Sequence, residues 1–107
     1  MIPDDYADAT TQSRRLAILR VLRENEGAAN ESLLRISLHQ LGFRGLLATE
    51  EAIRDDGRWL AERHLVTVEL YKDRITTLVV TDRGLAFLRR GISPIPGIQF
   101  PDEASTA

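Results

Sequence analysis

The chain of 107 residues contains no cysteine, which excludes disulfide bonds and thiolate metal ligands. It has no apolar run close to the roughly 20 residues that a helix needs to cross a bilayer. Its first residues are acidic and lack the basic and apolar regions of a signal peptide. Aromatic residues make up only 6% of the sequence, which is too few for an aromatic cofactor site. These absences predict a single cytoplasmic domain that does not contact a membrane.

The sequence also lacks the strong basic surplus of many nucleic-acid-binding proteins, since its net charge is -2. The acids are concentrated at the two ends, where no basic residue accompanies them. Those terminal acids are Asp4, Asp5, Asp8, Asp102 and Glu103. Residues 11–90 carry 14 basic and 11 acidic residues, so the central part of the chain is mildly basic. This distribution is compatible with contacts to phosphate groups, although the expected electrostatic attraction is small.

Residues suited to catalysis are equally scarce. The two histidines, His39 and His64, are expected to be structural or surface residues. Asp55 and Asp56 are adjacent, so on a helix they diverge by about 100° and do not converge on one substrate. Residues 42–45 lack the lysine and the spacing of a phosphate-binding loop. We therefore expect a protein that is not an enzyme and that uses no cofactor or metal.

The first helix is predicted from an apolar cluster. Residues 1–12 have no periodicity and are expected to be flexible, and Ser13 is a plausible N-cap for a helix that ends near residue 24. The apolar residues of this helix occupy more than one side. They are Leu16, Ala17, Ile18, Leu19, Val21 and Leu22. The helix is therefore expected either to be deeply buried or to be shared between two subunits.

Two further helices follow. Asn30 is a good N-cap for a helix over residues 31–41, and Gly42 stands where a left-handed C-cap residue belongs. The connection over residues 42–48 is longer than the tightest helix-turn-helix turn. Thr49 then caps a third helix that extends to residue 62. Gly57 inside this helix costs stability, which suggests that a neighbouring helix approaches closely there.

In the next part of the chain, two short segments that contain alternating apolar and polar residues flank a predicted turn. Residues 66–70 and 75–80 are predicted strands joined by a tight turn, and Thr81 caps a last helix that Gly91 terminates. The tail after Gly91 holds three of the four prolines but is still apolar. Proline excludes a helix or a central strand there, so we expect an extended arm on the domain or on a second subunit, with a disordered end.

These elements predict an α+β fold that is mainly α, with the architecture of a winged helix-turn-helix. Three helices precede a β-hairpin wing, and a C-terminal helix and an extended arm follow it. The expected division is a flexible segment over residues 1–12, a winged-helix domain over residues 13–91, and the arm and disordered end over residues 92–107.

Two short motifs in the sequence also resemble motifs of known proteins. Residues 60–66, Leu-Ala-Glu-Arg-His-Leu-Val, match the Leu-x-x-x-x-Leu-Val ending that winged-helix regulators commonly carry on the recognition helix. Residues 80–84, Val-Thr-Asp-Arg-Gly, match the step that often leads from the wing into the last helix. With the arm over residues 91–101, the chain resembles a family of small proteins from Mu-like bacteriophages and prophages, grouped with ArsR-like winged-helix regulators.

The resemblance covers most of residues 13–101 and implies a winged-helix fold with a DNA-related function in the cytoplasm of a bacterial host. Metal-sensing ArsR relatives use cysteines, and this sequence has none, so thiolate metal sensing does not carry over. A phage or prophage transcriptional regulator that binds double-stranded DNA is the first hypothesis for function.

Six residues are predicted to contact DNA, and Arg14 or Arg15 is an additional candidate. Arg54 and Arg58 lie four residues apart on one side of the third helix, where each can read guanine through paired donors. Lys72 and Arg74 at the hairpin tip are expected to reach phosphate or the minor groove. Arg44 in the turn is a candidate phosphate clamp, as are Arg14 and Arg15 near the start of the first helix. The remaining predicted DNA-contacting residue, at the start of the third helix, is Thr49.

Two alternatives stay open at this point. Arg54 and Arg58 can instead pair with Glu50, Glu51 or Asp55 at helical spacing, as ordinary surface charges do. The acidity of the third helix and the apolar arm also fit a module that binds another protein. In either case, the surplus apolar surface of the first helix and of the arm predicts a homodimer.

Overall fold

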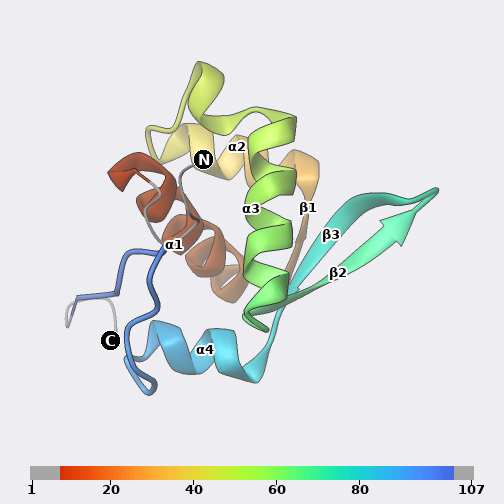
Figure 1. Cartoon of the computed structure of the whole chain (residues 1–107). Coiled ribbons are helices and arrows are strands. Elements are labelled where there is room, and N and C mark those ends of the chain that lie inside the picture. Colours follow the sequence, from red (N-terminus) through yellow and green to blue (C-terminus); the bar gives the residue numbers. More distant parts are fainter. Residues whose placement is uncertain (1–7, 103–107) are drawn as a thin grey trace.

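The computed structural model describes residues 8–102 and has an α+β fold that is mainly helical (Figure 1). The predicted flexible residues 1–7 and the predicted disordered residues 103–107 lie outside the described residues. The elements in order are α1 (Ala9–Glu24), β1 (Ala28–Asn30), α2 (Glu31–Gln40), a short 3₁₀ helix (Gly45–Ala48), α3 (Glu50–Glu62), β2 (Val66–Tyr71), β3 (Arg74–Val80) and α4 (Asp82–Leu88). Within residues 8–102, each helix is too short or too polar to cross a bilayer.

Local signals placed most helix ends correctly. The side chains of Asn30, Thr49 and Thr81 each accept a hydrogen bond from the backbone N–H three residues later, as an N-cap does. The predicted start of the first helix is wrong, because α1 begins at Ala9 and Asp8 caps it by accepting from the Thr11 N–H at 2.7 Å. That hydrogen bond lowers the pKa of Asp8. The part of the predicted flexible segment that follows Asp8 is therefore helical.

The sheet has three antiparallel strands in the order β1-β3-β2, and the β2–β3 hairpin projects away from the helices (Figure 1). Lys72 and Asp73 both have positive φ, at 51° and 63°, which is the geometry of a two-residue type I′ turn. Strand β1 was not predicted, since it is three residues long and too short to show alternation. It pairs with β3 through Ala29 and Leu78, which makes β3 the central strand. At the apolar end of β3, Leu78 is buried, and Val79 and Val80 are half-buried.

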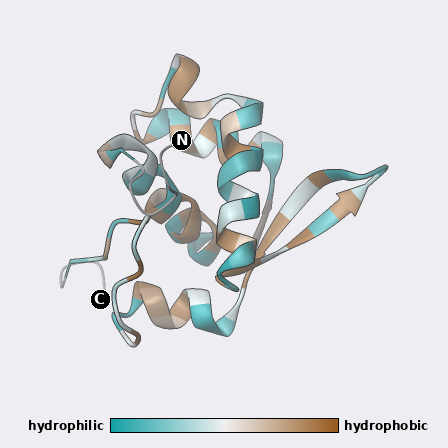
Figure 2. Cartoon of the chain, viewed as in Figure 1, coloured by the Kyte–Doolittle hydropathy of each residue, from teal (hydrophilic) through white to brown (hydrophobic). Residues whose placement is uncertain are grey.

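The apolar residues of α1 are buried by the chain itself. Leu16, Ile18, Leu19 and Leu22 are at most 1% exposed, and α1 packs against α2, α4 and the sheet. Of the two alternatives left open for the first helix, burial within one chain is therefore the correct one. Hydrophobic residues also remain on the connection between α2 and α3 (Figure 2), where Leu46 is exposed.

The C-terminal arm lies on its own domain. Ile98 is buried, and the ring of Phe100 meets Phe87 of α4 edge-to-face with 5.6 Å between ring centroids. The Gln99 N–H donates to the carbonyl oxygen of Gln12 at 3.2 Å, which fastens the arm to α1. The arm therefore covers apolar surface of the same chain, and its hydrophobic residues no longer indicate a second subunit.

Two glycines allow close packing between elements. A Cβ at Gly84, in the first turn of α4, would lie 2.3 Å from the carbonyl oxygen of Leu65 and 2.7 Å from Val80. A Cβ at Gly57 would lie 3.0 Å from a terminal methyl group of Leu78. The close approach predicted at Gly57 is thus present, but its partner is strand β3 and not a helix. The two clashes differ in kind, because backbone cannot move aside as easily as a leucine side chain.

We expect Gly84→Ala to destabilise the protein by about 3 kcal/mol, since the added methyl group forces α4 away from Leu65. Gly57→Ala is the matched control. Its contact involves only the end of a flexible side chain, and alanine raises helix propensity by about 1 kcal/mol, so its stability should stay within about 1 kcal/mol of the wild type. Urea denaturation of both variants measures the difference. Equal losses of stability in the two variants would contradict the predicted backbone clash.

Candidate functional site

Three of the predicted DNA-contacting residues meet in a cleft between the exposed side of α3 and the β2–β3 hairpin. Arg54 and Arg58 come from α3, and Arg74 comes from the first residue of β3. The lining of the cleft consists of Glu51, Arg54, Asp55, Arg58, Asp73, Arg74 and Ile75. The tight turn after Tyr71 returns β3 beside α3, which brings residues 54 and 74 together although they are far apart in sequence.

The arginines of the cleft are held in ion pairs. Glu50 Oε1 accepts from Arg54 Nη1 at 3.1 Å and from Arg74 Nη2 at 2.7 Å. Arg58 Nη1 donates to Asp55 Oδ1 at 3.0 Å. The alternative of helical-spacing pairs is therefore realised for Glu50 and Asp55. Exposed pairs of this kind contribute about 0–1 kcal/mol each, so an incoming ligand can replace them.

The other three predicted residues lie in different surroundings. Lys72 is exposed at the hairpin tip, with its ammonium group 5.4 Å from the centre of the Tyr71 ring. The hydroxyl of Thr49 accepts from the Ala52 N–H at 3.1 Å, so its lone pair serves the cap of α3. Arg44 is exposed and precedes the 3₁₀ helix, outside the lining of the cleft. The structure thus places Arg54, Arg58 and Arg74 in one cleft, whereas Lys72 lies outside its lining, at the tip of the β2–β3 hairpin.

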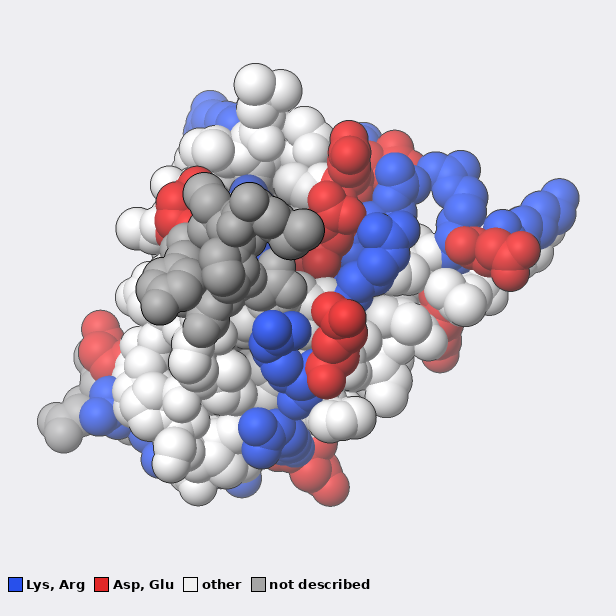
Figure 3. All heavy atoms as spheres, viewed as in Figure 1, with Lys and Arg blue, Asp and Glu red and all other residues white. Residues whose placement is uncertain are grey.

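The charge on this surface is mixed. Figure 3 shows acidic and basic side chains alternating along α3 and across to the hairpin, without a continuous basic area on this face. Most of the side chain is exposed in both members of the Arg58–Asp55 pair, at 62% and 59%. Solvent screens such pairs, and the field of the surface falls off within about 10 Å at moderate salt.

A buried charged cluster, which was not predicted from the sequence, lies between α3 and α1. Asp56 is 1% exposed, and Arg14 and Arg15 are both 7% exposed. Arg14 Nε donates to Asp56 Oδ2, and Arg15 Nε donates to Asp56 Oδ1 at 3.1 Å. The prediction that Arg14 or Arg15 clamps phosphate is wrong, because both guanidinium groups neutralise a carboxylate inside the protein. We call Arg14, Arg15 and Asp56 the buried triad.

The buried triad also fastens the segments on either side of α3. Arg14 Nη1 donates to the Leu47 carbonyl oxygen at 3.1 Å, and Arg15 Nη1 donates to the Gly97 carbonyl oxygen at 2.9 Å. The guanidinium carbon of Arg15 also lies 4.2 Å from the centre of the Trp59 ring. The α2–α3 connection, the arm and α3 are therefore all held to α1 by these two side chains.

A second acidic group lies close to Glu50. Burial of Glu31 in the first turn of α2 raises the pKa of its carboxyl group, and the charge of Glu50 raises that pKa further. Glu31 Oε1 is buried and has no hydrogen-bond partner among the described residues. Arg54 and Glu31 line the same small cavity between α2, α3 and β3. The carboxylates of Glu31 and Glu50 therefore both interact with the positive charges of Arg54 and Arg74 at the start of α3.

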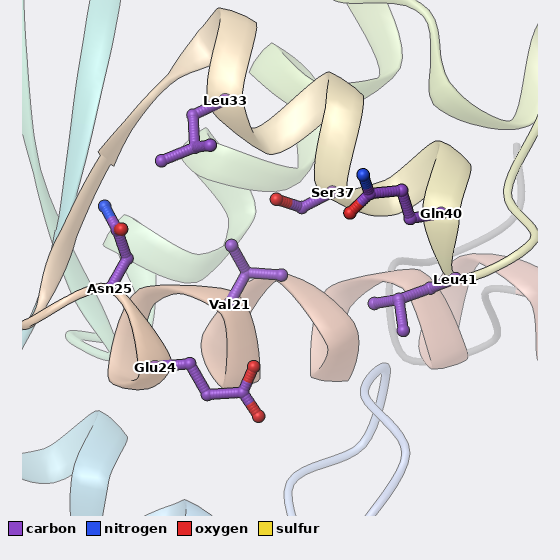
Figure 4. Close-up of a pocket in the computed structure, with 7 residues that line it drawn as sticks. All are labelled: Val21, Glu24, Asn25, Leu33, Ser37, Gln40 and Leu41. Carbon is purple, nitrogen blue, oxygen red and sulfur yellow. The ribbon is translucent and has the colours of Figure 1, made fainter.

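A separate groove runs between α1 and α2 (Figure 4). Its lining combines the apolar side chains of Val21, Leu33 and Leu41 with polar side chains. Those polar residues are Glu24, Asn25, Ser37 and Gln40. None of the predicted DNA-contacting residues lines this groove, so the cleft beside α3 remains the candidate site.

The fold and the site define a small α+β domain that presents a charged helix and hairpin. The chain is 34% identical to the uncharacterized protein gp26 of Escherichia phage Mu over 94 residues, which cover 88% of this chain and 93% of that protein. It is also 34% identical over 80 residues to an uncharacterized protein of Haemophilus influenzae, covering 75% of this chain and 76% of that protein. No family model and no solved structure matches the chain. The chain belongs to the family of phage Mu gp26, and the predicted kinship with Mu-like phage proteins is confirmed.

We expect Asp56→Asn to destabilise the protein by about 3 kcal/mol, since it leaves two buried guanidinium groups without a counter-charge. The neighbouring substitution Asp55→Asn makes the same chemical change in an exposed pair and should cost less than about 1 kcal/mol. Denaturant melts of the two variants provide the comparison. A loss of stability in Asp56→Asn no greater than that in Asp55→Asn would contradict the role given to the buried triad.

The raised pKa of Glu31 predicts a pH dependence. The folded state holds the Glu31 proton more tightly than the unfolded state, so this group lowers stability as pH rises from the ordinary glutamate pKa of 4.5 through the higher folded pKa. Glu31→Gln removes this effect, and the stability of this variant relative to the wild type should increase between pH 4 and neutral pH. Thermal melts at both pH values test this. A difference that stays constant with pH would rule it out.

Proposed function

We propose that this protein is a winged-helix DNA-binding protein and a phage or prophage transcriptional regulator. In this proposal α3 enters the major groove of double-stranded DNA, and the β2–β3 hairpin follows the backbone. The observation that carries it is the cleft in which Arg54, Arg58 and Arg74 converge from the helix and from the hairpin. Arginine is the residue best suited to both guanine edges and phosphates.

The arrangement of the elements supports the winged-helix part of the proposal. Helices α2 and α3 are joined by a connection with one 3₁₀ turn, and α3 leads directly into the β2–β3 hairpin. Strand β1 lies between α1 and α2 and completes the sheet on the far side of β3. In a winged helix, α3 is the recognition helix and the hairpin is the wing.

The ion pairs of the cleft are compatible with DNA contact. Arg58 is largely exposed, so exchanging Asp55 for a phosphate or a base costs little. Lys72 stands at the hairpin tip and is available for a phosphate. The alternating charges predict weak non-specific binding, and sequence recognition would depend on the few side chains that reach base edges.

A homodimer remains part of the proposal, since dimers can read two half-sites. The α1 and arm residues that first suggested this dimer are covered by the chain itself. Other large apolar side chains are exposed on α2 and on the α2–α3 connection, and Leu46 is the most exposed at 88%. They are Ile36, Leu41, Leu46 and Leu47.

A second candidate function is a winged-helix module that binds another protein. The acids interleaved on α3 in Figure 3 favour it, because acidic groups next to phosphates reduce affinity for DNA. The exposed leucines of the α2–α3 connection favour it as well, since a cluster of exposed apolar side chains is typical of an interaction surface.

A mobility-shift titration with duplex DNA at low salt tests the first candidate. We expect Arg54→Ala to reduce discrimination between sequences, and Lys72→Ala to weaken binding to all sequences and lower the salt dependence. Arg35→Ala removes the same charge from an exposed position of α2 outside the cleft and serves as the control. Unchanged binding in both cleft variants would refute the assigned roles. Absence of retardation by the wild type at micromolar concentration would favour the second candidate.

A further inference from the structure

A single carboxylate oxygen holds the two arginines that lie nearest to the junction of α3 and the hairpin. Glu50 Oε1 accepts from Arg54 at 3.1 Å and from Arg74 at 2.7 Å. From this geometry we infer that Glu50 is a built-in competitor of phosphate, which keeps Arg54 and Arg74 paired until an external phosphate group replaces its carboxylate. This regulation of the cleft rests on the proposed DNA-binding function.

The position of Glu50 favours this role over that of its acidic neighbours. Glu50 is the first residue of α3, where the exposed backbone N–H groups favour a carboxylate. Its side chain is 39% exposed and that of Arg54 is 25% exposed, so their pair is less screened by solvent than the pair of Asp55 and Arg58. Glu50 also bridges two elements, whereas Asp55 pairs with an arginine of its own helix.

Glu31 makes the release of Glu50 more costly. Its carboxylate lies close enough to Glu50 for the two negative charges to interact, and Arg54 reduces their repulsion. When Arg54 and Arg74 turn toward a phosphate, Glu50 and Glu31 lose the cations between them. Repulsion within this pair of acids therefore opposes binding of the anion and draws the arginines back after it leaves.

The bridge also ties the hairpin to α3. Arg74 is the first residue of β3 and directly follows the type I′ turn, so its pair with Glu50 fixes the tip of the hairpin relative to the helix. When a phosphate replaces the carboxylate, the ion pair between Arg74 and Glu50 is lost and a contact between Arg74 and the ligand takes its place. Arg54 and Arg74 would then hold one phosphate between the helix and the hairpin.

Glu50→Gln is the substitution that isolates this effect, and Glu51→Gln is its matched control. Glu51 lies in the same helix turn, lines the cleft and forms no ion pair among the described residues, so both variants raise the net charge by one. We expect Glu50→Gln to bind mixed-sequence duplex DNA about five- to tenfold more tightly than the wild type, since two exposed pairs no longer have to be broken. Glu51→Gln should change the affinity by roughly twofold or less. Equal gains in the two variants would mean a general charge effect and would overturn the inference.

A second measurement uses inorganic pyrophosphate and needs no DNA. Side-chain NMR signals of Arg54 and Arg74 should shift at lower pyrophosphate concentrations in Glu50→Gln than in the wild type, while Glu51→Gln resembles the wild type. Identical titrations in all three proteins would overturn the inference even if DNA binds. A pyrophosphate response without any DNA retardation would instead remove the proposed function and support the competitor role of Glu50.

Discussion

The position of α3 depends on the buried carboxylate of Asp56 between the guanidinium groups of Arg14 and Arg15. Burying charges is costly, and it is tolerated here because the Asp56 carboxylate accepts hydrogen bonds from both guanidinium groups. The triad has two positive charges and one negative charge, and the carbonyl oxygens of Leu47 and Gly97 accept further hydrogen bonds from it. The two carbonyl contacts that complete the triad therefore also fix the α2–α3 connection and the arm. Removing Asp56 would leave two buried guanidinium groups without a counter-charge, and removing either arginine would take away one of the two carbonyl contacts, so these segments depend on one another.

This arrangement separates two charged sides of α3. Asp56 faces α1 and is fully buried, whereas Asp55 lines the cleft, Glu50 pairs with two arginines of the cleft, and both of these acids remain accessible. Trp59 lies on the inner side, where the guanidinium groups of Arg15 and Arg63 approach its ring to 4.2 Å and 3.9 Å. The inner charges fix the position of the helix, whereas the outer charges are accessible to solvent and, in the proposed function, would exchange partners with a ligand. A helix with a fixed base and exchangeable surface groups is suited to presenting side chains to a binding partner.

Much of the fold could be predicted because its signals are local. The caps at Asn30, Thr49 and Thr81 and the turn before Arg74 depend on residues a few positions apart. The features that were missed depend on distant contacts. Strand β1 exists through its pairing with β3, and the burial of Arg14 and Arg15 requires Asp56 about forty residues away. The one available signal was that Asp56 shares a helix side with Ile53 and Leu60, where a charge needs a partner. The cleft was predicted in part, since spacing placed Arg54 and Arg58 together but could not show that Glu50 joins Arg54 to Arg74.

In the proposed DNA-binding role, the alternating charges on α3 would favour selectivity over affinity. Each arginine of the cleft already has a carboxylate partner, so a ligand gains only the difference between its own contact and the internal pair. A ligand that offers one phosphate at an arbitrary position gains little. A ligand that contacts Arg54, Arg58 and Arg74 together would offset the free energy lost with the broken ion pairs, because bidentate contacts from guanidinium groups are strong when their geometry is met. Under the proposed DNA-binding function, discrimination would come from these carboxylates as much as from the arginines, since a partner that contacts only one arginine gains little over the internal pair.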